Sequence, residues 1–408
     1  MTKQIKILIS DTGGGHRASA NSLKSALNIL YPESLPLDNI EIVDLFVVHS
    51  PKISPFVNAP AAYKFLAAYP DLLWKNVYEL GEIPAVQKFN DCLTYTVCNE
   101  GWRRGLSYMG DGKTTDMKEA IRPDLIISCH PLTNAVPLAI LSESSATKDI
   151  PFVTICTDLN SAHSTWFNKK CDKIFVPTQK LADKATETCP SEKVKVVGLP
   201  IRQGFWNLDD DPNTTRSTQR ANALKALNLP EDKRLAVIVG GGDGMGRVAD
   251  CATTIGSLVA NPDLNAQLVV ICGSNQKLKE DLEKKFKSDS NVIVKGFVSD
   301  MDVHMLAASI LITKAGPGTL AEAAACGTPT ICTSFLPGQE EGNVDLVVEG
   351  GWGEFCSDGD PGKLGKVVED WLSRGKGFLE NMELNAKKDG RAKATLDLGG
   401  EIGGILNL

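Results

Sequence analysis

A short apolar run that ends in a Gly- or Asp-rich turn and continues into a helical pattern recurs along the whole chain. The first instance is Lys6–Ser10, which runs into the turn Asp11–His16. This rhythm predicts parallel α/β units. The runs are too apolar for a half-exposed sheet, so we expect helices on both of its faces. In such sheets, ligands bind beyond the carboxyl ends of the strands.

The candidate strands fall into two series. The first comprises Lys6–Ser10, Asp124–His130, Phe152–Asp158, Lys173–Thr178 and Lys193–Gly198, and the second comprises Leu235–Val239, Gln267–Gly273, Asn291–Phe297, Ser309–Ala315 and Thr328–Ser334. A polar stretch, Asn207–Asn222, separates the series, and the second has its own glycine-rich turn at Gly240–Gly246. This restart predicts two Rossmann-like domains with parallel sheets that face each other across a cleft.

The predicted domain boundaries follow these changes of pattern. They are 1–205 for an N-terminal domain with an inserted lobe at 51–112, 206–222 for a linker, 223–372 for a C-terminal domain, and 373–408 for a terminal segment of uncertain role.

Charge and cysteine content exclude several classes of protein. The net charge is −7, and residues 1–200 carry 21 basic and 21 acidic side chains, so the acidic excess lies in the C-terminal half. A nucleic-acid partner is therefore not expected. The 11 cysteines form no CxxC pair and no Cys/His spacing typical of a metal site. They predict core residues of a protein from a reducing compartment, without a bound metal or other cofactor.

No apolar run approaches the roughly 20 residues that would span a bilayer, and no signal or transit peptide is recognisable. Any membrane contact is therefore expected to be peripheral. The lobe at 51–112 is rich in aromatic and aliphatic residues, among them Phe65, Leu66 and Trp74, interleaved with lysines. Two ordinary core helices would explain this pattern, and so would a lobe that faces a membrane, where aromatic and snorkelling lysine side chains are common.

The most informative segment is Ile312–Ala323. A strand ends there in the turn Gly316-Pro317-Gly318-Thr319 and a helix begins at once, so backbone amides can hold a diphosphate. We expect the Glu322 carboxylate on the first turn of that helix, within reach of both hydroxyls of a ribose. The loop Leu336–Asn343 follows the next strand, and its amides and carboxylates are suited to the hydroxyls of a hexose.

Several of these segments resemble one known family. The similarity covers Ser10–Ala20, Ser128–Leu132 and Thr157–Phe167 in the first half, and Gly198–Arg202, Gly240–Gly246, Val269–Gly273, Lys314–Glu322 and Gly338–Val344 in the second. In this order and at these spacings they are similar to the monogalactosyldiacylglycerol synthase family. The resemblance implies a GT-B glycosyltransferase, related to the MurG-like enzymes, that moves galactose from UDP-galactose to the sn-3 hydroxyl of diacylglycerol with inversion. It also implies a peripheral membrane protein of the plastid envelope, with an anionic membrane surface as partner, and a reaction that needs no metal.

The resemblance assigns roles to individual residues. It implies donor binding by Gly241, Gly242, Asp243, Phe297, Lys314, Gly316, Pro317, Gly318, Thr319, Glu322, Gln339, Glu340 and Asn343, with Glu322 on the ribose and Gln339 and Glu340 on the galactose. For the acceptor or lipid side the candidates are Gly14, Gly15, His130, His163 and Trp166, together with Phe65 and Trp74 from the membrane-facing interpretation of the lobe. Trp166 is equally compatible with a place in the core.

Inversion by direct displacement requires one base to deprotonate the acceptor. His16, in the glycine-rich turn after the first strand, is the first candidate because a histidine titrates near neutrality. Asp11 is the alternative, acting directly or by orienting His16. The resemblance also leaves other functions open: a UDP-glucose-dependent diacylglycerol glucosyltransferase, another MurG-like UDP-sugar transferase or, less favoured, a UDP-sugar 2-epimerase.

Overall fold

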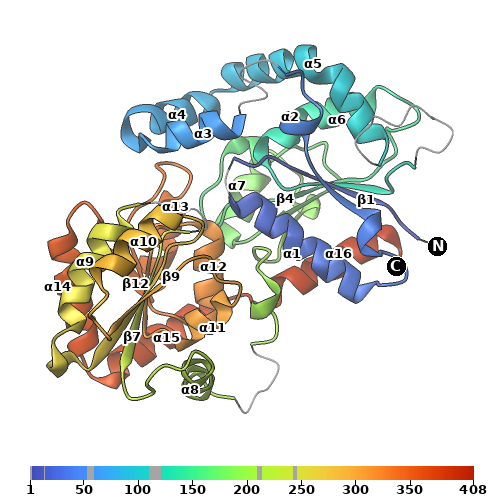
Figure 1. Ribbon diagram of the computed structural model, residues 1–408. Helices are drawn as coiled ribbons and strands as arrows, with labels where there is room; N and C mark the ends of the chain where they lie inside the picture. Colours follow the sequence, from blue (N-terminus) through green and yellow to red (C-terminus); the bar gives the residue numbers. More distant parts are fainter. Residues whose placement is uncertain (1, 13, 53–58, 110–120, 209–213, 242–245) are drawn as a thin grey trace. The chain divides into compact units, whose positions relative to one another are not determined.

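The computed structural model describes residues 2–12, 14–52, 59–109, 121–208, 214–241 and 246–408 (Figure 1). The chain forms two compact units. The first comprises Met1–Gln203, Leu336–Gln339 and Lys393–Leu408, and the second comprises Gly204–Phe335 and Glu340–Ala392. Each unit contains one six-stranded sheet in which every pairing is parallel, so the predicted α/β fold class is confirmed.

The two sheets account for all ten predicted strands. The first sheet has the order β2-β1-β3-β4-β5-β6, formed by β1 (Ile5–Ile9), β2 (Ile40–Asp44), β3 (Leu125–Ser128), β4 (Phe152–Ile155), β5 (Lys173–Val176) and β6 (Val194–Val196). The second has the order β12-β11-β10-β7-β8-β9, formed by β7 (Arg234–Val239), β8 (Ala266–Ile271), β9 (Val292–Lys295), β10 (Ile310–Thr313), β11 (Thr330–Cys332) and β12 (Gly353–Phe355). Only β2 and β12 were not predicted, and each lies at a sheet edge.

Helices connect the strands in both units. The first unit contains α1 (Gly14–Leu30), α2 (Leu45–Val48), α3 (Ala59–Ala67), α4 (Lys75–Glu82), α5 (Pro84–Ser107), α6 (Ala135–Ser142), α7 (Gln179–Thr186) and α16 (Ala394–Leu406), with a π-helical turn, η2 (Pro70–Trp74), between α3 and α4. The second contains α8 (Arg216–Ala226), α9 (Val248–Val259), α10 (Gln276–Lys285), α11 (Met301–Ala307), α12 (Pro317–Cys326), α13 (Glu341–Glu349), α14 (Pro361–Ser373) and α15 (Lys376–Asp389).

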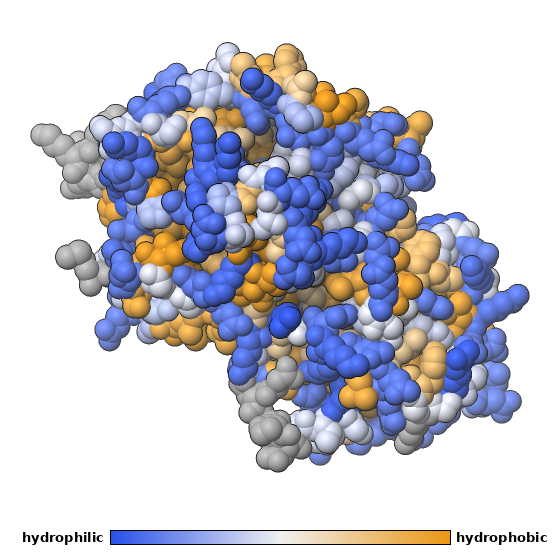
Figure 2. Space-filling view, turned by 180° about the vertical axis from the view of Figure 1, so that it is seen from behind, coloured by the Kyte–Doolittle hydropathy of each residue, from blue (hydrophilic) through white to orange (hydrophobic). Residues whose placement is uncertain are grey.

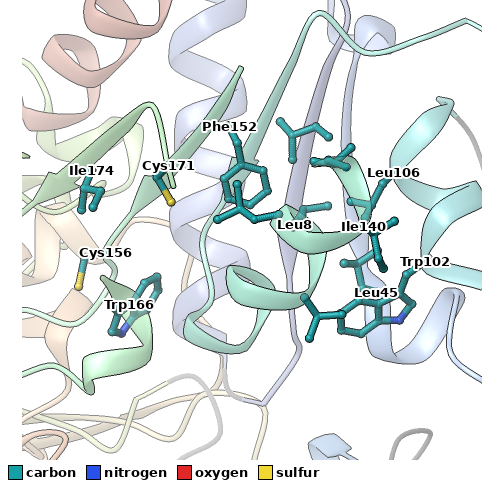
Figure 3. Close-up of a cluster of buried hydrophobic side chains, with 14 of the residues drawn as sticks. Leu8, Leu45, Trp102, Leu106, Ile140, Phe152, Cys156, Trp166, Cys171 and Ile174 are labelled. Atoms are coloured by element: carbon teal, nitrogen blue, oxygen red, sulfur yellow. The ribbon is translucent and has the colours of Figure 1, made fainter. Parts of the chain in front are cut away.

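Strand β1 is buried on both faces, as its composition predicts. Ile5, Ile7 and Ile9 pack in one hydrophobic cluster with residues of α1 and α16. Leu8 points to the opposite cluster, which contains Trp102 of α5 (Figure 3). The alternation places successive side chains on opposite faces of the sheet, so each face has its own helical layer.

Lys6 is a fully buried lysine on the α5 side of this strand. Its Nζ donates to the carbonyl oxygens of Gly105 and Tyr108, each at 2.6 Å, and lies 3.0 Å from Oε2 of Glu41. Burial lowers the pKa of Lys6, and the neighbouring Glu41 opposes that shift. A cation that meets the last carbonyls of a helix is favourable, so Lys6 fastens the end of α5 to the sheet.

The C-terminal helix α16 belongs to the first unit and packs along α1. Thr395 accepts from the amide of Ile201 and donates to its carbonyl, both at 2.9 Å. Gly399 and Gly403 allow the close approach, because a Cβ would lie 2.7 Å from Cδ1 of Leu30 at the first position and 2.0 Å from Oη of Tyr31 at the second. The last part of the segment 373–408, to which the sequence assigned no role, therefore completes the core of the first unit, whereas α15 belongs to the second unit.

We expect Gly403→Ala to destabilise the first unit by about 1–3 kcal/mol, because the added methyl group overpacks the contact with Tyr31. Gly404→Ala is the matched control. Gly404 is exposed and a Cβ there would meet nothing within 4 Å, so alanine should stabilise the helix by about 0.5–1 kcal/mol. Urea unfolding, monitored by hydrogen exchange in α1 and α16, measures both changes in stability. Equal midpoints for the two variants would contradict the packing argument.

Candidate functional site

The carboxyl ends of β1, β3 and β4 bring together the polar residues of the first unit. His16 lies in the first turn of α1, His130 follows β3, and Thr157 follows β4. The rings of His16 and His130 are 4.6 Å apart in an edge-to-face arrangement. The glycines before His16, Gly14 and Gly15, are exposed, and a Cβ on either would meet nothing within 4 Å. This end of the sheet is therefore open in front of α1.

The hydrogen bonds of His16 fix its tautomer. Its Nδ1 lies 3.0 Å from the carbonyl oxygen of Cys129 and 2.8 Å from Oγ1 of Thr157. A carbonyl only accepts, so Nδ1 carries the hydrogen and Nε2 has the lone pair of a base. Among the described residues, Nε2 has no hydrogen-bond partner. Although part of the residue is accessible, burial of the ring lowers the pKa of His16 to about 4. The expectation that it titrates near neutrality is therefore wrong.

The described hydrogen bonds of the Asp11 carboxylate are with Arg17 and not with His16. Its two carboxylate oxygens accept from Nε and Nη2 of Arg17, each at 2.6 Å. Its backbone amide donates to Oδ2 of Asp44 at 2.8 Å. The described hydrogen bonds thus orient His16 through Cys129 and Thr157, not through Asp11.

The other two predicted histidines are held by their own loops. His130 accepts at Nδ1 from the amide of Leu132 and therefore donates from Nε2 to Oγ1 of Thr12 at 3.1 Å. His163 accepts at Nδ1 from the amide of Thr165, which leaves its Nε2 3.9 Å from Oε1 of Glu82. Burial lowers the pKa of both rings. Both histidines are therefore neutral at physiological pH, and both Nδ1 atoms are already occupied.

Neither of the two tryptophans predicted for the acceptor or lipid side is an exposed surface residue. Trp166 is fully buried and donates from Nε1 to Oδ2 of Asp158 at 2.7 Å, which favours its place in the core over a lipid contact. Trp74 is half-buried between the rings of Tyr63 and Tyr78, at 5.1 and 6.0 Å. Both indoles therefore support the fold around the site.

Asp158 is a buried carboxylate that was not among the predicted site residues. Besides binding Trp166, its Oδ1 accepts from Nε2 of Gln339 at 3.1 Å, and Gln339 belongs to the first unit. The signal was available in the sequence, because Asp158 lies at the end of a predicted strand.

In the second unit, the N-terminus of α12 offers unpaired amides. Gly316 is the N-cap and Pro317 is the first helical residue. Among the described residues, the amides of Gly318 and Thr319 have no hydrogen-bond partner, and a Cβ at Gly318 would meet nothing within 4 Å. The first turn carries no acidic side chain. Such an end attracts an anion.

The N-terminus of α9 differs in charge. The amide of its N-cap, Arg247, donates to Oδ2 of Asp358 at 3.2 Å, and Asp250 lies in its first turn. Two carboxylates therefore already lie at this end, one of them paired with the Arg247 guanidinium. Of these two helix N-termini, that of α12 is the better phosphate site.

Four further predicted donor residues, Glu322, Lys314, Glu340 and Asn343, lie on α12, just before it or at the start of α13. Glu322 is buried and is the sixth residue after the N-cap, so it belongs to the second turn of α12 and not to the first, where the sequence predicts it. Lys314 binds Glu340, and Asn343 donates from Nδ2 to the carbonyl of Ala315 at 2.9 Å. These bonds join the turn after β10 to the start of α13.

Phe297 follows the edge strand β9 and is 72% exposed, so its ring has a free face. Gly241 has a φ of 72°, a left-handed conformation that favours glycine. Gly242 and Asp243, also predicted for the donor side, lie outside the described residues.

Exposed apolar side chains concentrate on the lobe of α3, η2, α4 and the first turns of α5. They are Phe65, Tyr69, Leu72, Val77, Leu80, Ile83, Phe89 and Leu93. The last turns of α5 are instead buried through Trp102 and Leu106. Figure 2 shows hydrophobic residues at the surface of the molecule among hydrophilic ones.

No helix in the described part of the chain is long and apolar enough to cross a membrane. Within those same residues, no group of three or more His, Cys, Asp or Glu side chains could hold a metal ion.

Comparison with known families covers most of both units. The model of monogalactosyldiacylglycerol (MGDG) synthase matches residues 16–201, and that of the glycosyltransferase family 28 C-terminal domain matches residues 235–395. The MGDG synthase of Spinacia oleracea, named chloroplastic, is 35% identical over 97% of this chain and 71% of its own length. This chain belongs to the MGDG synthase family. MGDG synthase 1 of Arabidopsis thaliana, also named chloroplastic, is 34% identical over 97% of the chain and 70% of its own length.

Solved structures confirm the GT-B fold for this member of the MGDG synthase family. MurG of Acinetobacter baumannii matches 98% of the chain and 99% of its own, with a TM-score of 0.56 at 13% identity. WaaG, a glycosyltransferase involved in lipopolysaccharide biosynthesis, matches 98% and 99%, with a TM-score of 0.52 at 14% identity.

Proposed function

We propose that this chain transfers galactose from UDP-galactose to the sn-3 hydroxyl of 1,2-diacylglycerol, making monogalactosyldiacylglycerol. The observation that carries the proposal is its membership of the MGDG synthase family, with both units matched and 97% of the chain aligned to a synthase. The enzyme is a glycosyltransferase whose partners are a UDP-sugar and a lipid.

The donor diphosphate is assigned to the N-terminus of α12. Within the described part of the chain, the amides of Gly318 and Thr319 have no partner and can donate there, and the helix dipole favours the charge that develops on the leaving UDP. Glu322, in the second turn, is assigned to the ribose hydroxyls, because its side chain leans back toward the N-terminus of the helix. Gln339, Glu340 and Asn343 are assigned to the hexose, and the exposed Phe297 to the uracil.

The base is assigned to Nε2 of His16. In a direct displacement, the acceptor oxygen forms its bond to the anomeric carbon as the bond from that carbon to the UDP oxygen breaks. The hydroxyl proton passes to Nε2, whose lone pair is available because Nδ1–H is bound to Cys129 and Thr157. We assign a structural role in the turn to Asp11, which pairs with Arg17.

The lipid acceptor requires the enzyme to meet a bilayer, and the exposed apolar lobe is assigned to that contact. We propose peripheral binding to an anionic surface, supported by the lack of an acidic excess in residues 1–200. The relatives are named chloroplastic, and a plastid envelope location is proposed for this protein as well. Imaging a fluorescent fusion expressed from the complete gene tests that location.

Transfer to diacylglycerol liposomes from UDP-galactose or UDP-glucose tests the activity. We expect monogalactosyldiacylglycerol from the first donor and a kcat/KM at least ten times lower with the second. Preferential transfer from UDP-glucose would replace the galactose assignment with a glucosyltransferase. Conversion of the free UDP-sugar without lipid would instead indicate an epimerase.

The pH dependence tests the environment of His16. Because burial lowers the pKa of His16 to about 4, the base is neutral above that value. We expect kcat/KM to change less than about two-fold between pH 7 and 5.5 and to fall only as pH approaches 4. The unfolded chain takes up this proton near pH 6.5, so the same shift costs stability as the pH falls from 6.5 to 4. Circular dichroism at each pH controls for unfolding, and an acid limb centred near 6.5 in a folded enzyme would contradict the assignment.

A further inference from the structure

Lys314 joins two of the segments assigned to the donor. It follows β10 directly, and its Nζ lies 2.8 Å from Oε1 of Glu340, the residue before α13. The side chain of Glu340 is 5% exposed and that of Lys314 is 25% exposed. A nearly buried carboxylate is costly unless a cation or donors compensate it. Lys314 supplies this compensation from the solvent side.

The path of the Lys314 side chain passes two glycines. A Cβ on Gly316, the N-cap of α12, would lie 3.5 Å from Cε of Lys314 and 4.0 Å from Oε1 of Glu340. A Cβ on Gly241 would lie 3.9 Å from the same Cε. The ion pair therefore lies beside the N-cap of α12, next to the open amides of Gly318 and Thr319. This is the boundary between the sites assigned to the diphosphate and to the hexose.

Backbone contacts hold both ends of the pair. Asn343, fully buried, donates from Nδ2 to the carbonyl of Ala315, and its amide donates to the carbonyl of Glu340 at 3.1 Å. The amide of Ala315 donates to the carbonyl of Ser334 at 2.7 Å. Because the two backbones are fixed relative to each other, the ion pair sets the direction of the Glu340 carboxylate.

We propose that Lys314 is a positioning residue that holds the Glu340 carboxylate oriented toward the hydroxyls of the donor hexose. This inference rests on the proposed UDP-hexose function and deepens it. A carboxylate accepts at several positions, so binding one ammonium leaves it able to accept from a sugar. Lys314 then contributes to recognition of the hexose and not of UDP itself.

The experiment compares binding of UDP-galactose and of UDP to the full chain by calorimetry, with steady-state kinetics beside it. For Lys314→Met we expect a 10- to 100-fold weaker affinity for UDP-galactose and a similar rise in KM, the loss of one charge-assisted hydrogen bond. The affinity for UDP should change less than about three-fold by the same reasoning. Lys314→Arg keeps the charge and should recover part of the loss.

Glu340→Gln and the double variant Lys314→Met/Glu340→Gln complete a cycle. If Lys314 acts through Glu340, the double variant is no weaker than the worse single variant. If Lys314→Met weakens the binding of UDP as much as the binding of UDP-galactose, Lys314 is a phosphate ligand. If the losses in the two single variants add in the double variant, the two residues act independently. Either result overturns the inference. Melting temperatures identify a misfolded variant, for which Lys314→Gln is the substitute. If the wild-type chain does not bind UDP-galactose, the proposed function itself fails.

Discussion

Replacing His16 with glutamine is expected to lower kcat for galactose transfer by about 10²–10⁴-fold, the usual contribution of a positioned general base. Glutamine retains a polar group but cannot take up the acceptor proton. The affinity for UDP should stay within a factor of about two, because the UDP part of the donor is assigned to residues of the second unit. Single-turnover rates with diacylglycerol liposomes, together with UDP titrations, measure the two effects separately.

Asp11→Asn is the matched control for the competing base. Its carboxylate accepts two hydrogen bonds from Arg17, so the substitution should weaken the turn and reduce kcat by less than about ten-fold, as expected for a lost hydrogen bond rather than a lost base. A larger loss in Asp11→Asn than in His16→Gln would transfer the base role to Asp11. Thr157→Val should give an intermediate loss, since Thr157 only orients the His16 ring.

The fold was largely predictable because the strands of a covered parallel sheet are continuous apolar runs. The two strands that were missed lack this signal. β2, IEIVD, is interrupted by two acidic residues, and β12, GEF, is three residues long and begins with glycine. An edge strand has one hydrogen-bonded neighbour, so its sequence is less constrained than that of a central strand.

The sequence predicted where the site residues lie, but not their pKa, their burial or the helical turn that they occupy. Strand ends and glycine turns located His16 and Gly316–Thr319, yet the pKa of His16 depends on the burial of its ring and on the carbonyl of Cys129 after β3. The turn occupied by Glu322 depended on where α12 begins, which is fixed by Pro317 at its first position. Composition could not separate Trp166, fully buried, from Phe65, largely exposed.

The exposed face of the lobe leads to the second large effect. Phe65, Leu72 and Phe89 are 59%, 70% and 67% exposed. Moving such side chains from water into an apolar phase gains about 1.5–3 kcal/mol each. Changing all three to serine should therefore lower partitioning onto anionic diacylglycerol vesicles by roughly 10³-fold or more. Vesicle sedimentation measures the change. Trp74 and Leu66 are poorer targets than the sequence suggests, because both are half-buried within the lobe.

The control removes a comparable set of exposed apolar side chains elsewhere. Leu37, Val348 and Leu384 are 48%, 47% and 64% exposed and lie outside the lobe, so their triple serine variant should sediment like the wild type. The lobe variant should keep its kcat on a water-soluble, short-chain diacylglycerol, because His16 and the α12 N-terminus are untouched. Loss of that activity would mean that the lobe shapes the active site itself. Unchanged sedimentation would remove the lobe as the membrane contact and leave its exposed apolar face for another partner.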